Sequence, residues 1–391
     1  MTTLELTEDQ VLYFRARRGH LAGEGAAGAT AAARAVLGIQ AQQIEPALLA
    51  LSQRTAGRPT AAQLQEQLFE ADPRALVRTW GQRDTVHIYD AERHWARIVA
   101  AREQWAPPAR QGPLPDDEAL DSALDAIHAQ GAVTRKDLYD VTPDGYTEEI
   151  AERARSVRQE PIHFAAGRLL WKLTHRGDLS LVAKRGSEQL YAPRRAQFPK
   201  LAWPPELEDP TLANAELTRD YLAVYGPATA TDVAHFFGAR VTAARQWVKV
   251  LTRQKDLIDV TCGDRQGLLA LAADADDLRT PAPEDETGWP VRLLAKYDTM
   301  LMGHKDKTWT VPEEADRPQI WRKAANVLST VLWRGRLVAV WTFKKRRRDL
   351  ILTIEPLSGW HRGLLPAVER EAQEVARHLK RDSADVRVEK G

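Results

Sequence analysis

The sequence of 391 residues contains a single cysteine, Cys262, so no disulfide can form within the chain. A reducing compartment is therefore its natural environment. The first ten residues lack the basic region and apolar core of a secretory signal. No apolar run approaches the ~20 residues that a membrane-spanning helix needs. We therefore expect a cytoplasmic protein that does not enter a membrane.

The common signatures of catalysis are also missing. The sequence contains no P-loop, no Gly-rich dinucleotide turn, no HExxH metal motif and no GxSxG nucleophile elbow. Its 10 histidines are scattered, without metal-ligand spacing to one another or to Cys262. Spacing alone thus predicts neither a metal site nor a cofactor, and it reveals no catalytic machinery.

An excess of charge of one sign is absent as well. The 55 basic and 54 acidic residues give a net charge of +1. Such a balance excludes a uniformly basic coat for nucleic acid, but it is compatible with local basic patches. Apolar residues make up 43% of the chain, which is typical of a soluble globular protein.

Three proline-containing stretches divide the chain. They cover residues 105–119, 192–210 and 278–290, and their composition is typical of linkers. The length also favours two to four domains over one. We therefore predict four domains, with the boundaries 1–112, 113–205, 206–285 and 286–391.

The second and third predicted domains are variants of one pattern. Each has a helix that ends at a glycine, Gly131 or Gly226, followed by a threonine cap and a short helix. A further helix and two short strands follow, joined at Gly186 or Gly263. This order of helices and hairpin is that of a winged helix. The mainly helical first domain, with its strand pair, fits a third winged helix.

A basic stripe marks the predicted third helix of the third domain, within residues 240–254. Its apolar residues recur at helical spacing and should face the core: Val241, Ala244, Val248 and Leu251. Basic residues lie four apart on the other side: Arg245, Lys249 and Arg253. These charges suit contacts with DNA phosphates. A solvated helix face is nevertheless the commoner explanation of such a stripe taken alone.

The last domain is β-rich and carries an unbroken basic run. Strand-like segments lie within residues 291–303, 327–343 and 350–357. The run falls between the last two of them, which predicts a hairpin tip bearing Lys344, Lys345, Arg346, Arg347 and Arg348. Crowded like charges oppose folding, so a nucleic-acid role is favoured over a plain solvated turn.

Two glutamines, Gln40 and Gln42, precede an apolar helix in the stretch LGIQAQQIEPALLALSQRT, residues 37–55. Taken alone, such a pair is a structural or capping detail. The stretch is followed by ALVRTWGQRDTVHIYDAERH at 75–94 and LLAKYDTMLMGHKDK at 293–307. Together they resemble the bacterial winged-helix DNA glycosylases of the azinomycin-resistance (AlkZ-like) type. The resemblance covers essentially the whole chain in order.

This resemblance implies an α+β fold of three tandem winged helices followed by a C-terminal β-barrel-like domain. It also implies that Gln40 and Gln42 are catalytic, because Gln40-Ala41-Gln42 matches the Gln-apolar-Gln motif of the family. The implied activity is base excision from double-stranded DNA that contains alkylated purines. The implied substrates are bulky adducts or interstrand crosslinks of a DNA-alkylating natural product, in a self-resistance role.

The chemistry of amides agrees with such a substrate. Alkylation at purine N7 or N3 makes the base cationic, so the base departs without a general acid. The remaining task is to guide water to an oxocarbenium-like centre. Paired amides can do this with their carbonyl acceptors and NH₂ donors. We therefore expect hydrolysis alone, with no lysine nucleophile, no metal and no other cofactor.

Two departures from the family pattern affect the other candidate residues. The family's Met-Arg-Gly-Thr-apolar-His stretch is Gln82 to His87 here, with Asp84 in place of glycine. Its Phe-Asp-Glu segment is Tyr297-Asp298-Thr299. Contacts with the lesion or the DNA backbone, or alternatively a packed or surface position, remain open for Trp80, Arg83, His87 and Asp298.

Two other functions remain open at this stage. A winged-helix transcriptional regulator would need a dimerisation helix or an effector domain, and the sequence shows neither. A non-catalytic DNA-binding protein is the second alternative. For the glycosylase we expect a nucleoid-associated monomer that holds bulky lesions in an open cleft between winged helices and barrel. The basic hairpin would grip the DNA backbone or enter the minor groove.

Overall fold

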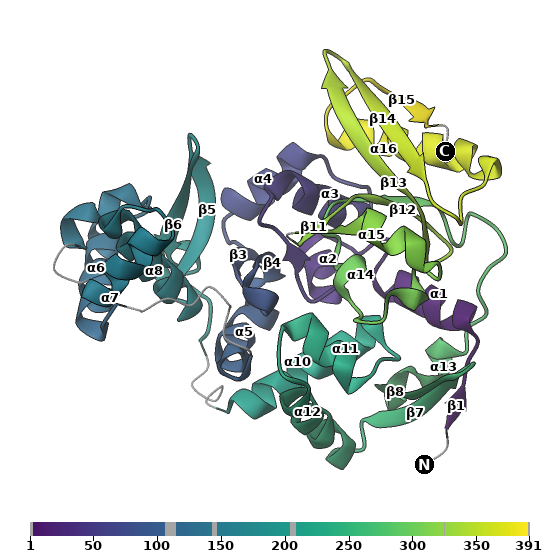
Figure 1. Ribbon diagram of the computed structural model, residues 1–391, viewed down its shortest axis with the longest axis horizontal. Coiled ribbons are helices and arrows are strands. Elements are labelled where there is room, and N and C mark those ends of the chain that lie inside the picture. Colours follow the sequence, from purple (N-terminus) through teal and green to yellow (C-terminus); the bar gives the residue numbers. More distant parts are fainter. Residues whose placement is uncertain (1–2, 106–114, 143–146, 204–208, 324, 390–391) are drawn as a thin grey trace.

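The structure, a computed structural model, describes residues 3–105, 115–142, 147–203, 209–323 and 325–389. These residues form a mixed fold of helices and five small sheets (Figure 1). The α+β class predicted from the sequence is therefore confirmed. No helix in these ranges is long and apolar enough to cross a membrane.

The first unit combines helices with a small antiparallel sheet. Its elements are α2 (Ala29–Ala35), β2 (Ile39–Gln40), α3 (Ile44–Arg54), α4 (Ala61–Phe69), β3 (Leu76–Trp80), β4 (Val86–Asp90) and α5 (Ala96–Ala101). Thr60 begins α4 through a reciprocal capping pattern with Gln63. Strand β4 is central, so His87 lies opposite Gln40 of β2 on one side and opposite Thr79 of β3 on the other.

The second unit is a group of helices followed by a hairpin. Its elements are α6 (Asp117–Gln130), the 3-10 turn η4 (Lys136–Val141), α7 (Glu148–Ser156), α8 (Pro161–His175), β5 (Leu179–Arg185), β6 (Glu188–Pro193) and α9 (Arg194–Gln197). Helix α6 ends at Gly131, with a φ of 84°, and the hairpin turns at Gly186, with a φ of 64°. Both positions agree with the sequence-based prediction.

The third unit repeats this order and gains a strand from the N-terminal region. Its elements are β1 (Leu4–Glu5), α1 (Glu8–Arg18), α10 (Pro210–Tyr225), α11 (Ala230–Phe237), α12 (Val241–Arg253), β7 (Leu257–Cys262), β8 (Arg265–Leu271) and α13 (Ala275–Leu278). Thr229 caps α11 together with Asp232, and the hairpin turns at Gly263. Strand β1 pairs in parallel with β7, Leu4 opposite Val260, which the sequence did not predict.

The C-terminal part contains a five-stranded sheet and one long helix. Its elements are β9 (Arg292–Leu294), α14 (Thr299–Met302), α15 (Arg317–Ile320), β10 (Trp321–Arg322), β11 (Asn326–Val327), β12 (Thr330–Trp333), β13 (Arg336–Arg346), β14 (Asp349–Pro356), α16 (Leu365–His378) and β15 (Ser383–Val388). The strand order is β15-β14-β13-β12-β9, in which only β15 and β14 are parallel. Strands β10 and β11 form a separate pair.

The prediction of a C-terminal β-barrel was wrong, because the five-stranded sheet in the described residues is open, with β15 and β9 at its edges. Helix α16 connects β14 to β15 and returns the chain to lie parallel beside β14. Strand β9 forms the opposite edge. The apolar face of α16 is buried, with Val368, Ala372 and Val375 almost inaccessible. A helix therefore covers the core that further strands of a barrel would have enclosed.

One apolar core joins the first unit, the third unit and the C-terminal sheet. Its buried members include Leu48 of α3, Phe236 of α11, Leu352 of β14 and Val375 of α16. The second unit has a smaller core of its own, centred on α6 and α8, and meets the first unit where β5 packs beside β3 (Figure 1). The division into four domains with the predicted boundaries stays a prediction.

Candidate active site

The Gln40-Ala41-Gln42 motif lies where the chain leaves β2 and approaches α3. Gln40 is the last residue of β2 and is 8% exposed, whereas the Gln42 side chain is open to solvent. Gln40 Nε2 donates a hydrogen bond to Gln42 Oε1 at 3.2 Å. The two amides are therefore linked directly, the Gln40 amide being buried and the Gln42 amide exposed.

Arg83 contacts the buried amide from the interior. Its Nη2 donates to Gln40 Oε1 at 3.4 Å, and its Nη1 donates to the carbonyl of Phe236 on α11 at 2.5 Å. Burial lowers the pKa of Arg83 to about 10, so the guanidinium stays charged at neutral pH. A Cβ on Gly238, whose φ is 72°, would lie 3.0 Å from Arg83 Cα. Close approach of the third unit thus fixes Arg83 beside the glutamines.

The peptide between the glutamines is held by Arg78 on β3. Its Nε and Nη2 donate to the Ala41 carbonyl at 3.1 and 2.9 Å, and its Nη1 donates to Gln189 Oε1 on β6 at 2.6 Å. Arg78 is 6% exposed, and burial lowers its pKa to about 10. The sequence analysis missed this residue. The signal was a lone charge within a short strand that is otherwise uncharged and mostly apolar.

His87 lies directly behind Gln40 in the sheet and does not reach the surface. Its side chain is fully buried, Nδ1 lies 3.0 Å from the Thr85 carbonyl, and its ring stacks on Tyr89 with centroids 5.5 Å apart. Burial and, secondly, the charge of Arg83 lower the pKa of His87 to about 3. The ring is therefore neutral at pH 7 and supports Gln40 as a packed residue.

Two neighbours of the motif connect it to the second unit. Trp80, at the end of β3, is half-buried, and its ring centroid lies 5.8 Å from that of His175 on α8. Asp84 accepts a hydrogen bond from Trp171 Nε1 at 3.2 Å and lies 3.1 Å from His175 Nε2. The φ of Asp84 is 50°, in the left-handed region that favours glycine, which is the residue of the family pattern at this position. Asp84 therefore adopts a backbone conformation that is less favourable for aspartate than for glycine. Its side chain in turn connects this turn to α8 through Trp171 and His175.

Asp298 is an interior residue. Its carboxylate oxygens accept hydrogen bonds from Arg54 Nη1 and Nη2 at 2.8 and 2.7 Å, and neither side chain is more than 1% exposed. Asp298 Oδ1 also accepts from the Met300 amide at the start of α14. The structure therefore places this candidate lesion contact in an ion pair between α3 and the C-terminal part. Its partner Arg54 was not predicted.

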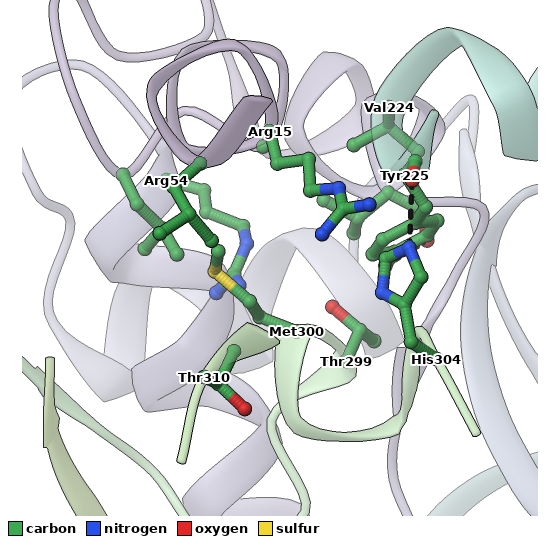
Figure 2. A pocket seen from close by; sticks show the side chains of 12 residues that line it. Arg15, Arg54, Val224, Tyr225, Thr299, Met300, His304 and Thr310 are labelled. Atoms are coloured by element: carbon green, nitrogen blue, oxygen red, sulfur yellow. Dashed lines mark hydrogen bonds between the residues drawn. The ribbon is translucent and has the colours of Figure 1, made fainter. Parts of the chain in front are cut away.

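A small cavity adjoins this ion pair. Figure 2 shows Arg54, Arg15, Thr299 and His304 pointing toward it. Its volume of about 10 Å³ has room for one water molecule and none for a nucleotide. His304 Nε2 lies 2.8 Å from the Tyr225 carbonyl, and burial lowers the pKa of His304 well below its usual value. The cavity belongs to the interior and not to the substrate site.

The basic run lies on the hairpin β13–β14, as the sequence predicted. Its side chains are all exposed: Lys344, Lys345, Arg346, Arg347 and Arg348. Lys345 forms an ion pair with Glu45 on α3, and Arg348 Nε pairs with Asp382 at 2.7 Å. Glu45 comes three residues after Gln42. The hairpin therefore stands beside the glutamine pair.

The second predicted basic surface lies elsewhere. Arg245, Lys249 and Arg253 are all exposed on α12, and the opposite side of the helix buries Ala244 and Leu251 as predicted. Val241 and Val248 are half-buried against the same core. In Figure 1, α12 and the β13–β14 hairpin lie toward opposite ends of the molecule, with the first unit between them. The structure does not bring these two basic surfaces together.

The amide pair and the neighbouring basic hairpin can be compared with known proteins. A family model described as DNA glycosylase AlkZ-like matches residues 33–378. The chain belongs to the AlkZ-like DNA glycosylase family. The prediction of a DNA glycosylase, made from three sequence stretches, is therefore confirmed.

Similar AlkZ-like proteins include one from Streptomyces sahachiroi. The chain is 25% identical over 381 residues to the "Interstrand DNA cross-link repair glycosylase" of that organism, covering 94% of this chain and 95% of the relative. It also resembles the solved structure of Streptomyces sahachiroi DNA glycosylase AlkZ, with a TM-score of 0.77 and 24% identity over 99% of this chain and 100% of that one. The two chains share a fold from end to end.

Proposed function

We propose that this glycosylase is monofunctional and hydrolyses the N-glycosidic bond of cationic N7- or N3-alkylpurines in double-stranded DNA. Bulky adducts and interstrand crosslinks are its proposed substrates. The observation that carries the proposal is the hydrogen-bonded pair Gln40–Gln42, supported by Arg83. The name of the S. sahachiroi relative assigns crosslink repair to that protein, which supports the same role here. Membership of a glycosylase family disfavours a regulator or an inert DNA-binding protein.

The amide oxygens can hold the attacking water. Gln40 Oε1 accepts one hydrogen bond from Arg83, and Gln42 Oε1 accepts one from Gln40. A carbonyl oxygen has two lone pairs, so each amide keeps one for a water proton. The water oxygen then points at the anomeric carbon as the glycosidic bond lengthens. The same carbonyl dipoles stabilise the positive charge that develops on the sugar. The glycosidic bond breaks with its electron pair on the cationic base, which leaves neutral without a general acid, and the proton lost by the attacking water passes to the solvent.

We also propose that the three helical units are winged helices, with the boundaries predicted from the sequence, and that the protein acts as a monomer. The helix–helix–helix–hairpin order of the second and third units supports the first statement. In this arrangement α12 and the β13–β14 hairpin contact the duplex at separate places, on either side of the glutamines.

Base release tests the proposed activity. The substrates are duplexes with a single N7-methylguanine or a bulkier N7-alkylguanine, and abasic sites are scored by alkaline strand cleavage. We expect release of at least the bulky lesion, above the spontaneous rate of a protein-free control. Tight binding to both duplexes without release from either would contradict the proposal.

Neutralising the hairpin charges that form no ion pair described above should weaken DNA binding in a salt-dependent way. The variant replaces Lys344, Arg346 and Arg347 by alanine. Each lost phosphate contact lowers the slope of log Kd against log salt by about 0.9, so a decrease of about 2 to 3 is expected. Fluorescence anisotropy at several salt concentrations measures the slope. A control variant with Arg370→Ala and Arg377→Ala removes two charges on α16, which pair with Glu286 and Glu374, and should keep the original slope. An unchanged slope in the hairpin variant would exclude the hairpin from the DNA interface.

Replacing Arg78 by methionine removes three hydrogen bonds at similar side-chain length. We expect base release to slow by roughly 10- to 100-fold, because a small displacement of positioned groups costs this order of rate. DNA affinity should change little, since Arg78 is buried. Of the three Arg78 bonds, Gln189→Ala removes only the outer one, together with the bonds from Gln189 Nε2 to the Val182 and Leu190 carbonyls, and it should slow release far less. Single-turnover rates beside anisotropy separate the two effects. Equal loss of affinity and rate would argue against a positioning role.

A further inference from the structure

A second, larger cavity lies beside the glutamine motif. It is bounded by the start of α3, the middle of β13 and the residue that ends α16, and its volume is about 490 Å³. Trp341 and Phe343 form an aromatic wall, with ring centroids 5.8 Å apart and planes inclined at 28°. The apolar lining is completed by Ile44, Pro46, Leu49 and Leu379. This size and apolar character are typical of a site for an organic group.

Chain connectivity places the cavity next to the reaction site. Gln43 lines it and directly follows Gln42, and consecutive Cα atoms are about 3.8 Å apart. Glu45 also lines the cavity, and its partner Lys345 comes from the basic hairpin. The cavity therefore has an apolar wall and a polar rim, and the rim adjoins the exposed amide.

Strand β13 provides a second connection. Phe343 forms part of the cavity wall, and the next residues along the same strand are the exposed Lys344, Lys345 and Arg346. A duplex held at this hairpin by its phosphates would lie over the cavity mouth. The cavity is thus bordered on one side by the basic β13–β14 hairpin and on another by the glutamine pair.

Purine geometry connects the cavity with the substrate. N7 and the glycosidic N9 belong to the same five-membered ring and are separated only by C8. When the glycosidic bond lies at Gln40 and Gln42, a substituent on N7 therefore emerges close to the bond that breaks. A methyl group at N7 is too small to reach into the cavity. A larger apolar substituent can bury its surface there, and removal of that surface from water favours binding.

We propose that this cavity binds an apolar, aromatic substituent on N7 of the damaged purine. The inference rests on the proposed function and refines its substrate class. The glycosylase then selects adducts with an aromatic arm, because binding of the arm positions the purine over the water held by the glutamines. Small N7-methyl lesions make no use of the cavity.

Two variants with opposite effects on the cavity test this inference. Phe343→Ala removes half of the aromatic wall, and Leu379→Trp fills the cavity from the end of α16. Both residues are only half-buried, so folding should be retained. Ile351→Ala is the matched control, a half-buried aliphatic residue opposite Lys344 whose side chain lies on the other sheet face. Single-turnover release is measured from duplexes with N7-methylguanine and with N7-(biphenylmethyl)guanine.

We expect Phe343→Ala and Leu379→Trp to slow release of the biphenylmethyl adduct by about 10-fold or more, with the methyl lesion and the control variant unaffected. Equal slowing of both lesions, or of neither, would overturn the cavity assignment while the glycosylase activity stands. Absence of release from both duplexes with the unaltered protein would instead overturn the proposed function, and the inference with it. Thermal melting of each variant checks that the fold is intact.

Discussion

Replacing Gln42 by alanine is expected to slow base release by about 100- to 1,000-fold, the cost of removing one positioned polar group from a transition-state site. Gln42 is exposed, and its removal leaves Gln40 without its amide partner. DNA affinity should change less than about twofold, because a neutral amide contributes no phosphate contact. Single-turnover release from an N7-alkylguanine duplex measures the rate, and anisotropy measures the affinity.

Two matched variants sharpen this result. Gln67→Ala removes another exposed glutamine of the same unit, on α4, and should leave the rate unchanged. Gln42→Glu keeps an acceptor at this position and supplies a charge, so it should retain much more activity than alanine. Wild-type rates in Gln42→Ala would show that the water is held elsewhere and would remove the basis of the proposed mechanism.

Replacing Asp298 by asparagine should lower the free energy of unfolding by about 3–5 kcal/mol. The substitution keeps the shape and the cap of α14 but leaves the Arg54 guanidinium, 1% exposed, without its counter-ion. Breaking a buried pair by neutralising one partner typically costs this much. Urea unfolding followed by tryptophan fluorescence measures the change, taken from the midpoint and slope of each transition.

The double variant Arg54→Met/Asp298→Leu provides the control. It removes both charges, and an apolar pair of similar volume often restores most of the lost stability. We therefore expect the double variant to be more stable than Asp298→Asn. A loss of less than about 1 kcal/mol in the single variant would mean that water or neighbouring groups already compensate Arg54. Because both residues lie in the interior, DNA binding by the folded fraction should be unaffected.

Local patterns predicted much of the fold. The helix ends and hairpin turns at Gly131, Gly186 and Gly263 follow from residues close together in the sequence, and the basic run does lie on a hairpin. Periodicity and turn chemistry are local properties, so a sequence shows them directly. The glutamine pair was singled out by resemblance, since spacing alone gave it no chemical meaning.

The missed features are contacts between distant residues. Arg54 and Asp298 are separated by 244 positions, and Arg83 and Phe236 by 153. The same holds for β15, which joins the sheet in parallel beside β14 and leaves it open. Nothing local distinguishes a lysine or arginine that will be buried from one that will be solvated. Only Arg78, the lone charge in the otherwise uncharged strand β3, gave a local sign of its role.

The short strand β1 has a consequence for how the protein is made. Leu4 and Leu6, together with Phe14 of α1, are buried against the third unit, whose strand β7 begins at Leu257. At about 5–20 residues per second, a ribosome needs roughly 10 to 50 s to reach that strand after it has made β1. During this time the apolar face of α1 lacks its partners in β7 and β8, and α10, which also contacts α1, is made only from Pro210 onward. The apolar face of α1 therefore stays uncovered during much of the synthesis of the following residues, which gives a chaperone a long opportunity to bind it.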